Sequence, residues 1–180
     1  MSQYKFKHGL AVMRAQPFHI GHQRLVNQML TECEHATIIL GSIQESATRR
    51  NPFDFETRKK MIQNIYQKTA DYNRLTITGL SDINNSKEWG DFVIRFLKEN
   101  FPDLPYPDAY YAGAEYDSNW FDGIIKHICL VDRTDKNFPL ISATMVREML
   151  KLGDPNWKNF IDPINHHIIE EYFDKKKDVI

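Results

Sequence analysis

The sequence predicts an α/β fold: a Rossmann-like, doubly wound parallel sheet in a single domain with a small C-terminal helical extension. Short apolar, β-branched runs alternate along the chain with longer segments in which apolar residues recur at helical spacing. Strands that alternate with helices form parallel sheets covered on both faces, and right-handed crossovers then wind the sheet in two directions. Ligands of such sheets bind outside the carboxyl ends of the strands. The strand-to-helix turns are therefore where a site is expected.

The first three elements follow from apolar patterning and chain breakers. HGLAVMRA (8–15) is predicted as a buried strand that Pro17 ends. The segment 20–34 carries apolar residues at i, i+1, i+4, i+5 and i+8, which indicates a helix. ATIILGS (36–42) is rich in β-branched residues and is predicted as the second strand, stopped at its Gly-Ser end.

The middle of the chain repeats this alternation. Segment 54–70 returns to helical spacing, and RLTITGL (74–80) is predicted as the third strand. Segment 87–101 has the clearest helical pattern of the chain, because its large apolar residues form one stripe.

The last elements complete the predicted sheet and add the extension. DAYYAG (108–113) and ICLVD (128–132) are predicted as strands. Segment 145–151 is predicted as a short helix ended near Gly153, and 164–176 as a C-terminal helix. The length of 180 residues suits one domain spanning the whole chain, with about 154–180 as the helical extension.

Composition excludes several classes of protein. The formal net charge is −1, so no global field attracts nucleic acid or an anionic membrane. The two cysteines, Cys33 and Cys129, are far apart in sequence and have no zinc-ligand spacing, which disfavours a disulfide framework and a zinc site. We find no signal-peptide pattern and no apolar run of membrane-spanning length. A cytoplasmic protein without nucleic-acid or membrane partners is expected.

The first strand-to-helix turn, RAQPFHIGH, gathers groups that favour an anion. His19 and His22 are three residues apart and share one face of the first helical turn. Gly21 has no side chain to hold off an incoming group, and the N–H groups at a helix start are unpaired. Arg14 adds a guanidinium that can bind phosphate through two hydrogen bonds. This turn predicts a polyphosphate site; the alternative is a His19 helix cap beside a solvated His22.

The turn after the second strand, GSIQESATRRNPFDFETR, is long and polar, as functional loops tend to be. Gly41 and Ser42 can offer backbone donors, and Arg50 can clamp a phosphate. A solvated basic loop is the alternative interpretation of the Arg49-Arg50 pair.

The segment ISATMVREML is a third candidate anion site. Ser142 and Thr144 occupy positions where N-cap hydroxyls belong, and Thr144 and Arg147 are three residues apart, off the apolar stripe. A capped helix with a surface arginine is an equally good interpretation. The stripe predicted to face the core consists of Met145, Val146, Met149 and Leu150.

Trp89 admits two interpretations. It falls on the apolar stripe of its predicted helix, which favours a place in the core. It also lies in the first turn of that helix, close to a strand end, where an indole face could stack on a flat heterocycle.

Four blocks make the chain resemble the archaeal-type nicotinamide-nucleotide adenylyltransferases over most of its length. They are RAQPFHIGH, GSIQESATRRNPFDFETR, SDINNSKEW and ISATMVREML. The tetrapeptide HIGH is shared with the wider nucleotidyltransferase superfamily, in which an [HT]-x-G-H motif handles ATP phosphates. The second block, with its G-S-x-Q and N-P-F, is the most family-specific. Ser86 stands where the family usually has asparagine, and the loop GAEYDSNW also departs from the family forms.

The resemblance implies an enzyme that makes NAD and pyrophosphate from ATP and nicotinamide mononucleotide (NMN), with Mg²⁺ carried by ATP. It implies that the ATP phosphates are held by Arg14, His19, His22 and Arg147. It places in the ATP site Gln16, Gly21, Gly113, Ser142 and Thr144. It assigns to the mononucleotide Gly41, Ser42, Arg50 and Trp89, with the indole stacked on the nicotinamide ring. Relatives are often multimeric, so a homo-oligomer is expected.

The implied chemistry is in-line attack of the mononucleotide phosphate on the α-phosphorus of ATP. Such a step needs no protein nucleophile and no carboxylate base, and the sequence has no nucleophile signature beside the motifs. Three alternatives remain. The acceptor could be nicotinate mononucleotide, phosphopantetheine or FMN in a related adenylyl- or cytidylyltransferase. The chain could be a nucleotide-binding sensor without turnover. An RNA-binding module is disfavoured by the near-zero net charge.

Overall fold

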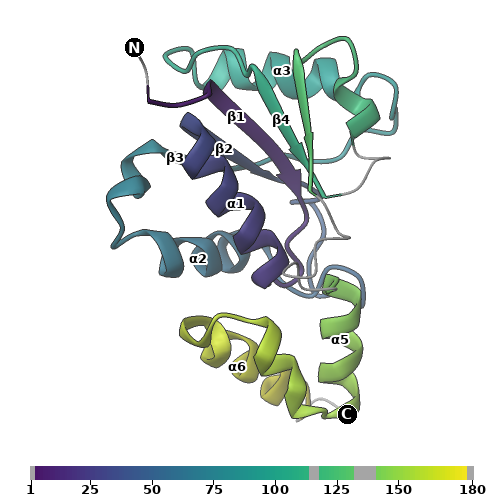
Figure 1. The fold of residues 1–180 in the computed structure, drawn as a ribbon. Coiled ribbons are helices and arrows are strands. Elements are labelled where there is room, and N and C mark those ends of the chain that lie inside the picture. Colours follow the sequence, from purple (N-terminus) through teal and green to yellow (C-terminus); the bar gives the residue numbers. More distant parts are fainter. Residues whose placement is uncertain (1–2, 114–117, 132–140, 178–180) are drawn as a thin grey trace.

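The computed structural model describes residues 3–113, 118–131 and 141–177. Five parallel strands form one sheet in the order β3-β2-β1-β4-β5 (Figure 1). They are β1 (Phe6–Met13), β2 (Cys33–Leu40), β3 (Leu75–Gly79), β4 (Ala109–Ala112) and β5 (His127–Leu130). The chain runs outward from β1 to β3 and returns on the other side of β1 to form β4. The predicted doubly wound, Rossmann-like sheet is therefore confirmed, and the strand order reverses between β1 and β4.

Helices cover both faces of the sheet. Helices α1 (Ile20–Glu32) and α2 (Phe55–Tyr66) lie on one face, and α3 (Trp89–Asn100) lies on the other (Figure 1). Helices α5 (Ala143–Leu152) and α6 (His166–Lys177) follow below the sheet in this view. None of the helices in the described parts of the chain is long and apolar enough to cross a membrane.

The central strands are buried on both sides, which explains their uninterrupted apolar sequences. Alternate residues point to opposite faces. On β1, Leu10 packs with the residues of α3, whereas Ala11 packs with those of α1 and α2. On β2, Ile39 and Ile38 divide in the same way. The larger of the two cores also takes in Ile169 of α6, so the C-terminal segment shares the core that lies beneath α1 and α2. A single domain with a C-terminal extension stays a prediction.

Two predicted boundaries shift where the chain enters and leaves the sheet. Cys33 was expected at the end of the first helix but begins β2, because its backbone pairs with Phe6 at the start of β1. The first strand ends at Met13 rather than continuing to Ala15, whose φ of 51° and the following cis Gln16–Pro17 bond turn the chain away. The site-bearing turn after β1 is therefore two residues longer than expected.

The remaining helices also differ at their ends. The helix expected at 54–70 ends at Tyr66 and is followed by a 3₁₀ turn at Ala70–Arg74. The helix expected at 145–151 begins at Ala143, because the Ser142 hydroxyl accepts the Met145 N–H as an N-cap. Met145 was wrongly expected to face the core: it is 45% exposed, and only Val146 of that stripe is fully buried.

The C-terminal histidines were both expected on a solvated surface, which is wrong for His166. Its Nε2 donates to the carbonyl oxygens of Ile161 and Lys158, and its ring meets that of Trp157 edge-on at 5.1 Å. His167 is exposed as expected. Asp132 and the side chains of Lys175–Lys177, for which we also made predictions, lie outside what the structure describes.

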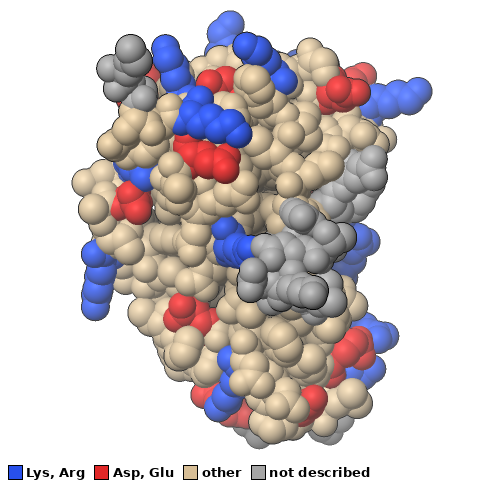
Figure 2. All heavy atoms as spheres, viewed as in Figure 1, with Lys and Arg blue, Asp and Glu red and all other residues tan. Residues whose placement is uncertain are grey.

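Charged side chains are interspersed over the face shown in Figure 2, where neither sign covers a large continuous area. This agrees with the net charge of −1. Any attraction for an anion must therefore be local.

Candidate active site

Two cavities meet at the carboxyl end of β1. The tryptophan cavity, of about 280 Å³, is lined by Val12, Met13, Arg14, Gly41, Ser42, Asp82, Ile83, Ser86, Trp89 and Trp120. The histidine cavity, of about 200 Å³, is lined by Val12, Met13, Arg14, His19, Gly21, His22, Leu25, Gly113, Val131, Ile141, Ser142 and Ala143. The last residues of β1 and Arg14 line both cavities. Arg14 thus stands at the boundary between them, beside the strand-order reversal where such folds bind ligands.

Hydrogen bonds at the start of α1 fix the tautomer of both motif histidines, His19 and His22. The Nδ1 of His19 accepts the Gly21 N–H at 3.1 Å, and the Nδ1 of His22 accepts the His19 N–H at 3.3 Å. A nitrogen that accepts a hydrogen bond carries no proton, so each neutral ring carries its proton on Nε2. The two histidines are therefore a reciprocal helix cap and, at the same time, Nε2–H donors in the wall of the histidine cavity.

Packing fixes the orientation of these two rings. Their centroids are 3.8 Å apart with an interplanar angle of 26°, and the Phe18 ring stacks on that of His22 at a centroid distance of 5.6 Å. A Cβ added at Gly21 would come within 3.0 Å of the His19 ring. Glycine at this position therefore gives room to the His19 imidazole, in addition to the open backbone that we expected from the sequence.

Arg147 lies near two other arginines from distant segments. Burial lowers the pKa of Arg147, and the nearby cations Arg14 and Arg50 lower it further, against the opposing effect of Glu148. Like charges that depress each other's ionisation would be stabilised by an anion between them. Arg14 is exposed on the wall of the histidine cavity and Arg50 is exposed on the loop after β2, whereas Arg147 lines a separate cavity with Arg49 and Glu148. That the three guanidiniums form one phosphate site stays a prediction.

Arg147 is anchored by two other predicted site residues. Its Nη1 donates to the backbone oxygen of Gln16 at 2.7 Å, and its Nη2 donates to the Thr144 hydroxyl at 3.0 Å. The Gln16 side chain was expected in the ATP site, but it is 1% exposed and both amide atoms bond the backbone of Phe53. Gln16 therefore shapes the turn, and Thr144 orients Arg147. Of the two predicted hydroxyls, Ser142 lines the cavity.

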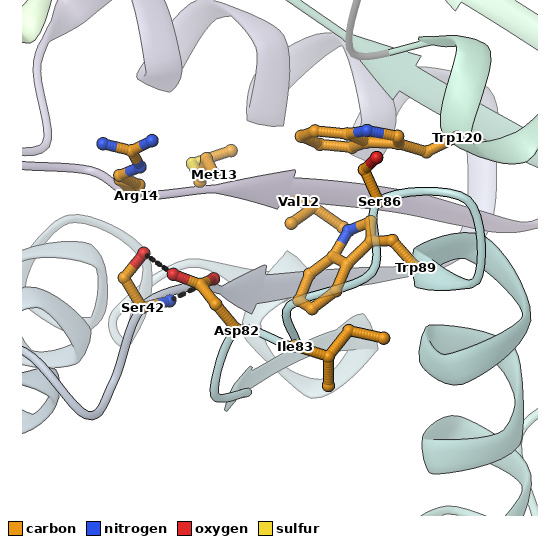
Figure 3. A pocket seen from close by; sticks show the side chains of 10 residues that line it. Val12, Met13, Arg14, Ser42, Asp82, Ile83, Ser86, Trp89 and Trp120 are labelled. Carbon is orange, nitrogen blue, oxygen red and sulfur yellow. Dashed lines mark hydrogen bonds between the residues drawn. The ribbon is translucent and has the colours of Figure 1, made fainter.

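The tryptophan cavity has one polar end and one aromatic end (Figure 3). Arg14 and Ser42 lie on one side, and Trp89, Trp120 and Ser86 lie on the other. Asp82 lies between these ends. Its carboxylate accepts the Ser42 hydroxyl at 2.6 Å and the Ser42 N–H at 3.2 Å.

The expectation that Gly41 and Ser42 present free backbone donors is wrong for this structure. The Gly41 N–H donates to the carbonyl of Met13 at 3.0 Å, and the Ser42 N–H donates to Asp82. These two N–H groups are occupied because the pairing of β2 with β1 continues to Gly41 and because the carboxylate of Asp82 follows β3. Gly41 and Ser42 still line the cavity.

The core interpretation of Trp89 is confirmed, and its stacking on a heterocycle stays a prediction. The residue is 7% exposed and belongs to the core around α3, yet it lines the tryptophan cavity. Its ring meets that of Trp120 at a centroid distance of 6.2 Å and an angle of 69°. The backbone of Trp120 packs so closely on Gly90 that a Cβ there would collide with the Trp120 carbonyl oxygen.

Two residues of this cavity escaped the sequence-based prediction. Trp120 follows β4 in the loop that departs from the family forms, so no motif pointed to it. Asp82 is part of the block SDINNSKEW, and an acidic residue two positions past a strand end was the available signal. No group of three or more potential metal ligands occurs among the described residues.

Comparison with known proteins agrees with this geometry. The cytidylyltransferase-like family model matches residues 11–149, which include the end of β1, the strands β2 to β5 and both cavities. The chain belongs to the cytidylyltransferase-like family. The nicotinamide-nucleotide adenylyltransferase of Thermoplasma acidophilum is 28% identical to it, over 91% of this chain and 86% of the relative. The nicotinamide/nicotinic acid mononucleotide adenylyltransferase of Acinetobacter baylyi is 33% identical, over 69% of this chain and 86% of the relative. The expected resemblance is confirmed.

Solved structures support the fold. A bifunctional NMN adenylyltransferase/ADP ribose pyrophosphatase from Francisella tularensis, complexed with AMP and a manganese ion, superposes with a TM-score of 0.74 at 24% identity. The match covers 93% of this chain and 49% of that protein, so this member of the cytidylyltransferase-like family spans about half the length of the bifunctional protein. The NadR protein in complex with NAD and AMP-PNP superposes with a TM-score of 0.62 at 15% identity, over 91% of this chain.

Proposed function

We propose that this protein transfers the adenylyl group of ATP to NMN, producing NAD and pyrophosphate. The observation that carries the proposal is the place of Arg14 between two cavities of different chemistry. The histidine cavity offers imidazole donors and the Arg14 guanidinium, which suits a triphosphate. The tryptophan cavity offers an indole wall, which suits a pyridine ring. A phosphate from each ligand would therefore meet at Arg14.

The reaction follows from this placement. An oxygen of the NMN phosphate forms a bond to the α-phosphorus of ATP, and the bond from that phosphorus to the bridging oxygen breaks. The electron pair leaves with pyrophosphate. The attacking phosphate is already ionised at neutral pH, so no side chain has to remove a proton. Catalysis then consists of holding the two phosphates in line and neutralising the charge that builds on them.

Each gathered group has a place in that scheme. His19 and His22 donate through Nε2–H to phosphate oxygens in the histidine cavity, and their Nδ1 caps prevent the rings from rotating. Arg147, held by Thr144 and the Gln16 carbonyl, would bind the leaving pyrophosphate. Arg14 would contact the α-phosphate, and Arg50 the NMN phosphate. These charges are fixed before the substrates arrive, so little reorganisation accompanies the reaction.

Mg²⁺ belongs to the substrate in this scheme. The described residues contain no cluster of metal ligands, which fits a cation that arrives on the triphosphate of ATP. Bound there, it would supply further neutralisation of the pyrophosphate charge.

The aromatic end of the tryptophan cavity favours NMN over nicotinate mononucleotide. The described residues there are Val12, Ile83, Ser86, Trp89 and Trp120, none of which is a cation. The charged group nearest to them in the lining is the carboxylate of Asp82 (Figure 3). A nicotinate carboxylate would lose water there without gaining a cationic partner, and it would be repelled by Asp82. The neutral carboxamide avoids both costs.

The test is direct synthesis. Purified protein is incubated with MgATP and NMN, and NAD and pyrophosphate are quantified. We expect equal amounts of both products and a lower kcat/KM with nicotinate mononucleotide. Phosphopantetheine and FMN serve as further acceptors. Product from one of those acceptors, with none from NMN, would refute the proposed substrate. Binding of ATP without release of pyrophosphate for any acceptor would indicate a nucleotide sensor instead. A cytoplasmic location and a homo-oligomeric state stay predictions.

A further inference from the structure

Arg58 of α2 is a completely buried arginine at the end of the block GSIQESATRRNPFDFETR, and no role was expected for it from the sequence. Its exposed fraction is 0%. Its Nη1 donates to the carbonyl oxygens of Arg14 and Gly41, each at 2.8 Å, and its Nε donates to the carbonyl of Asp54 at 3.2 Å. One guanidinium nitrogen therefore bridges the turns that follow β1 and β2, and both of these turns line the cavities.

Burial of the charged Arg58 side chain is energetically unfavourable. Burial lowers the pKa of Arg58, and the charges of Asp54 and Asp82 oppose that shift only from a distance. The hydrogen bonds of the side chain go to carbonyl oxygens, and its Nη2 is buried with no hydrogen-bond partner among the residues that the structure describes. Buried charges in proteins are normally paired with an opposite charge. An arginine kept in this state is expected to do something that an apolar residue could not.

The bridged carbonyls lie at strained points of the backbone. Arg14 is followed by Ala15 with φ of 51°, and Gly41 is followed by Ser42 with φ of 54°. Left-handed backbone is energetically unfavourable for residues other than glycine, because Cβ comes too close to the following carbonyl oxygen. Such conformations persist where the surroundings over-determine them, and they cluster at functional sites. Arg58 bonds the carbonyl group immediately before each strained residue, on both turns.

We propose that Arg58 is the positioning residue that sets the spacing between the triphosphate and mononucleotide sites. It locks the backbone from which the Arg14 side chain enters both cavities and the backbone that presents Ser42 to the tryptophan cavity. Its buried positive charge also lies behind the place where phosphates of both substrates would meet. Arg58 contacts neither substrate. This inference rests on the proposed function, because it assigns the two cavities to two phosphate-bearing ligands.

Arg74 provides a matched control in the same molecule. Its guanidinium also clamps backbone carbonyls, with Nη1 donating to Cys33 at 2.6 Å and Nη2 to Leu30 at 2.7 Å. These carbonyls lie at the amino end of β2, away from both cavities, and Arg74 has a carboxylate partner in Asp71 at 2.6 Å. Substituting Arg74 removes backbone hydrogen bonds of the same kind without touching the turns at the site.

The experiment compares Arg58→Lys with Arg74→Lys by calorimetric binding of ATP and of NMN, measured separately, and by turnover. Lysine keeps the charge, but its single ammonium cannot reproduce the guanidinium geometry that bridges the two carbonyls. We expect Arg58→Lys to weaken binding of both ligands and to lower kcat by about 10- to 100-fold, the size of one or two lost charge-assisted hydrogen bonds. Arg74→Lys should lower Tm while the folded protein keeps its affinities and kcat.

A second variant tests the same point by rescue. Arg58→Ala leaves a cavity of guanidinium size, and millimolar guanidinium chloride should restore part of its turnover, whereas sodium chloride should not. Arg74→Ala should gain nothing from guanidinium. The inference is overturned if folded Arg58→Lys binds ATP and NMN with unchanged affinity and turns over normally, or if its losses merely match those of Arg74→Lys. If the wild-type protein makes no NAD, the proposed function fails, but the ATP-binding comparison still decides the role of Arg58.

Discussion

The two ends of the sheet use the same residue types for opposite purposes. At the amino end, His8 of β1 donates from Nδ1 to the carbonyl of Pro105 at 2.6 Å and accepts the Thr37 hydroxyl at Nε2, at 2.8 Å. Both ring nitrogens are thereby satisfied inside the protein. At the carboxyl end, His19 and His22 use Nδ1 to cap their own helix and carry the proton on Nε2, in the wall of a cavity. The tautomer is reversed between the two ends.

The arginines show the same contrast. Arg74 at the amino end has carbonyl partners and a carboxylate, Asp71. Arg58 at the carboxyl end has carbonyl partners and an unsatisfied Nη2. At that end Arg14 and Arg50 also stand close enough to Arg147 to lower its pKa further. Arg74 at the amino end is thus paired with a carboxylate, whereas Arg14 and Arg50 at the carboxyl end repel Arg147. Phosphate-bearing ligands would relieve that repulsion.

The largest predicted effect is on turnover, and its absence would contradict the contrast between the two ends of the sheet. His22→Ala removes an Nε2–H donor from the histidine cavity and should lower kcat by about 10²–10³, the usual loss for one well-placed donor. The fold should stay intact, because the ring serves the helix end and not the core. Steady-state turnover and thermal unfolding measure the two properties. The exposed His167→Ala is the control, and near-normal turnover of His22→Ala would remove His22 from the mechanism.

The next prediction concerns the aromatic end of the tryptophan cavity. Trp120→Ala removes one of its two indoles and should raise the KM for NMN about tenfold or more, because stacking on a base is worth about 1–3 kcal/mol. The KM for ATP should stay unchanged, and Trp120→Phe should keep most of the NMN affinity. Tyr106→Ala, an exposed aromatic outside the cavity, controls for general effects. Equal losses for both substrates would contradict the assignment.

At the amino end, His8→Phe should affect stability and not rate. The substitution leaves the Pro105 carbonyl and the Thr37 hydroxyl without their partner, which should cost about 1–3 kcal/mol of unfolding free energy. Denaturant unfolding measures this cost. The kcat of the folded variant should equal that of the wild type. A large loss of kcat would show that the two ends are coupled and would weaken the comparison.

The pH dependence of stability should come from His8 and His35. Burial lowers the pKa of His35 to about 4, with His8 and Arg74 adding to the shift, and burial also lowers the pKa of His8. Since the unfolded chain takes up protons near the ordinary value of about 6.5, the unfolded state binds more protons below that pH. Stability should be complete above about 6.5 and fall as the pH drops toward 4, by at most about 1.4 kcal/mol per unit for each ring. A flat unfolding free energy between pH 7 and 5 would refute buried neutral histidines.

The smallest predicted effect is that of substituting Arg49, which we compare with its neighbour Arg50. Arg49 is 80% exposed and pairs with Glu148 at 3.3 Å on the surface. Arg49→Gln should change stability by less than about 0.5 kcal/mol and leave the KM for NMN unchanged, because surface ion pairs contribute little. Arg50→Gln should raise that KM, because Arg50 lies in the cluster with Arg147. The reverse order of effects would move the mononucleotide phosphate contact to Arg49.

Local motifs predicted much of the site. The spacing of His19 and His22 placed them on one face of a helix start, and the structure finds them there, lining a cavity with Arg14, Gly21, Gly113 and Ser142. Such features depend on a single turn of backbone, so nearby sequence is enough to specify them. Trp120 and Arg58 could not be found in this way. Trp120 reaches its cavity through packing on Gly90, thirty positions earlier. Arg58 closes the block GSIQESATRRNPFDFETR, but the block does not reveal that its guanidinium is buried against two turns.

The sequence also could not predict which backbone N–H groups stay available to a ligand. Gly41 and Ser42 were correctly placed beside a cavity, but their N–H groups are occupied by Met13 and Asp82. Which donors stay available depends on pairing with strands from other parts of the chain. Local sequence carries no record of that pairing.

The sequence by itself determined the order of strands and helices, the helix caps and the residue types at each strand end, because these depend on short-range patterns of polarity and backbone preference. The tertiary structure alone decided which nitrogen of each histidine carries the proton, which arginines stand together, and that one buried guanidinium ties two strained turns to each other. Those properties depend on distances between segments that are far apart in the chain. These distances are set only when the strands and helices fold together.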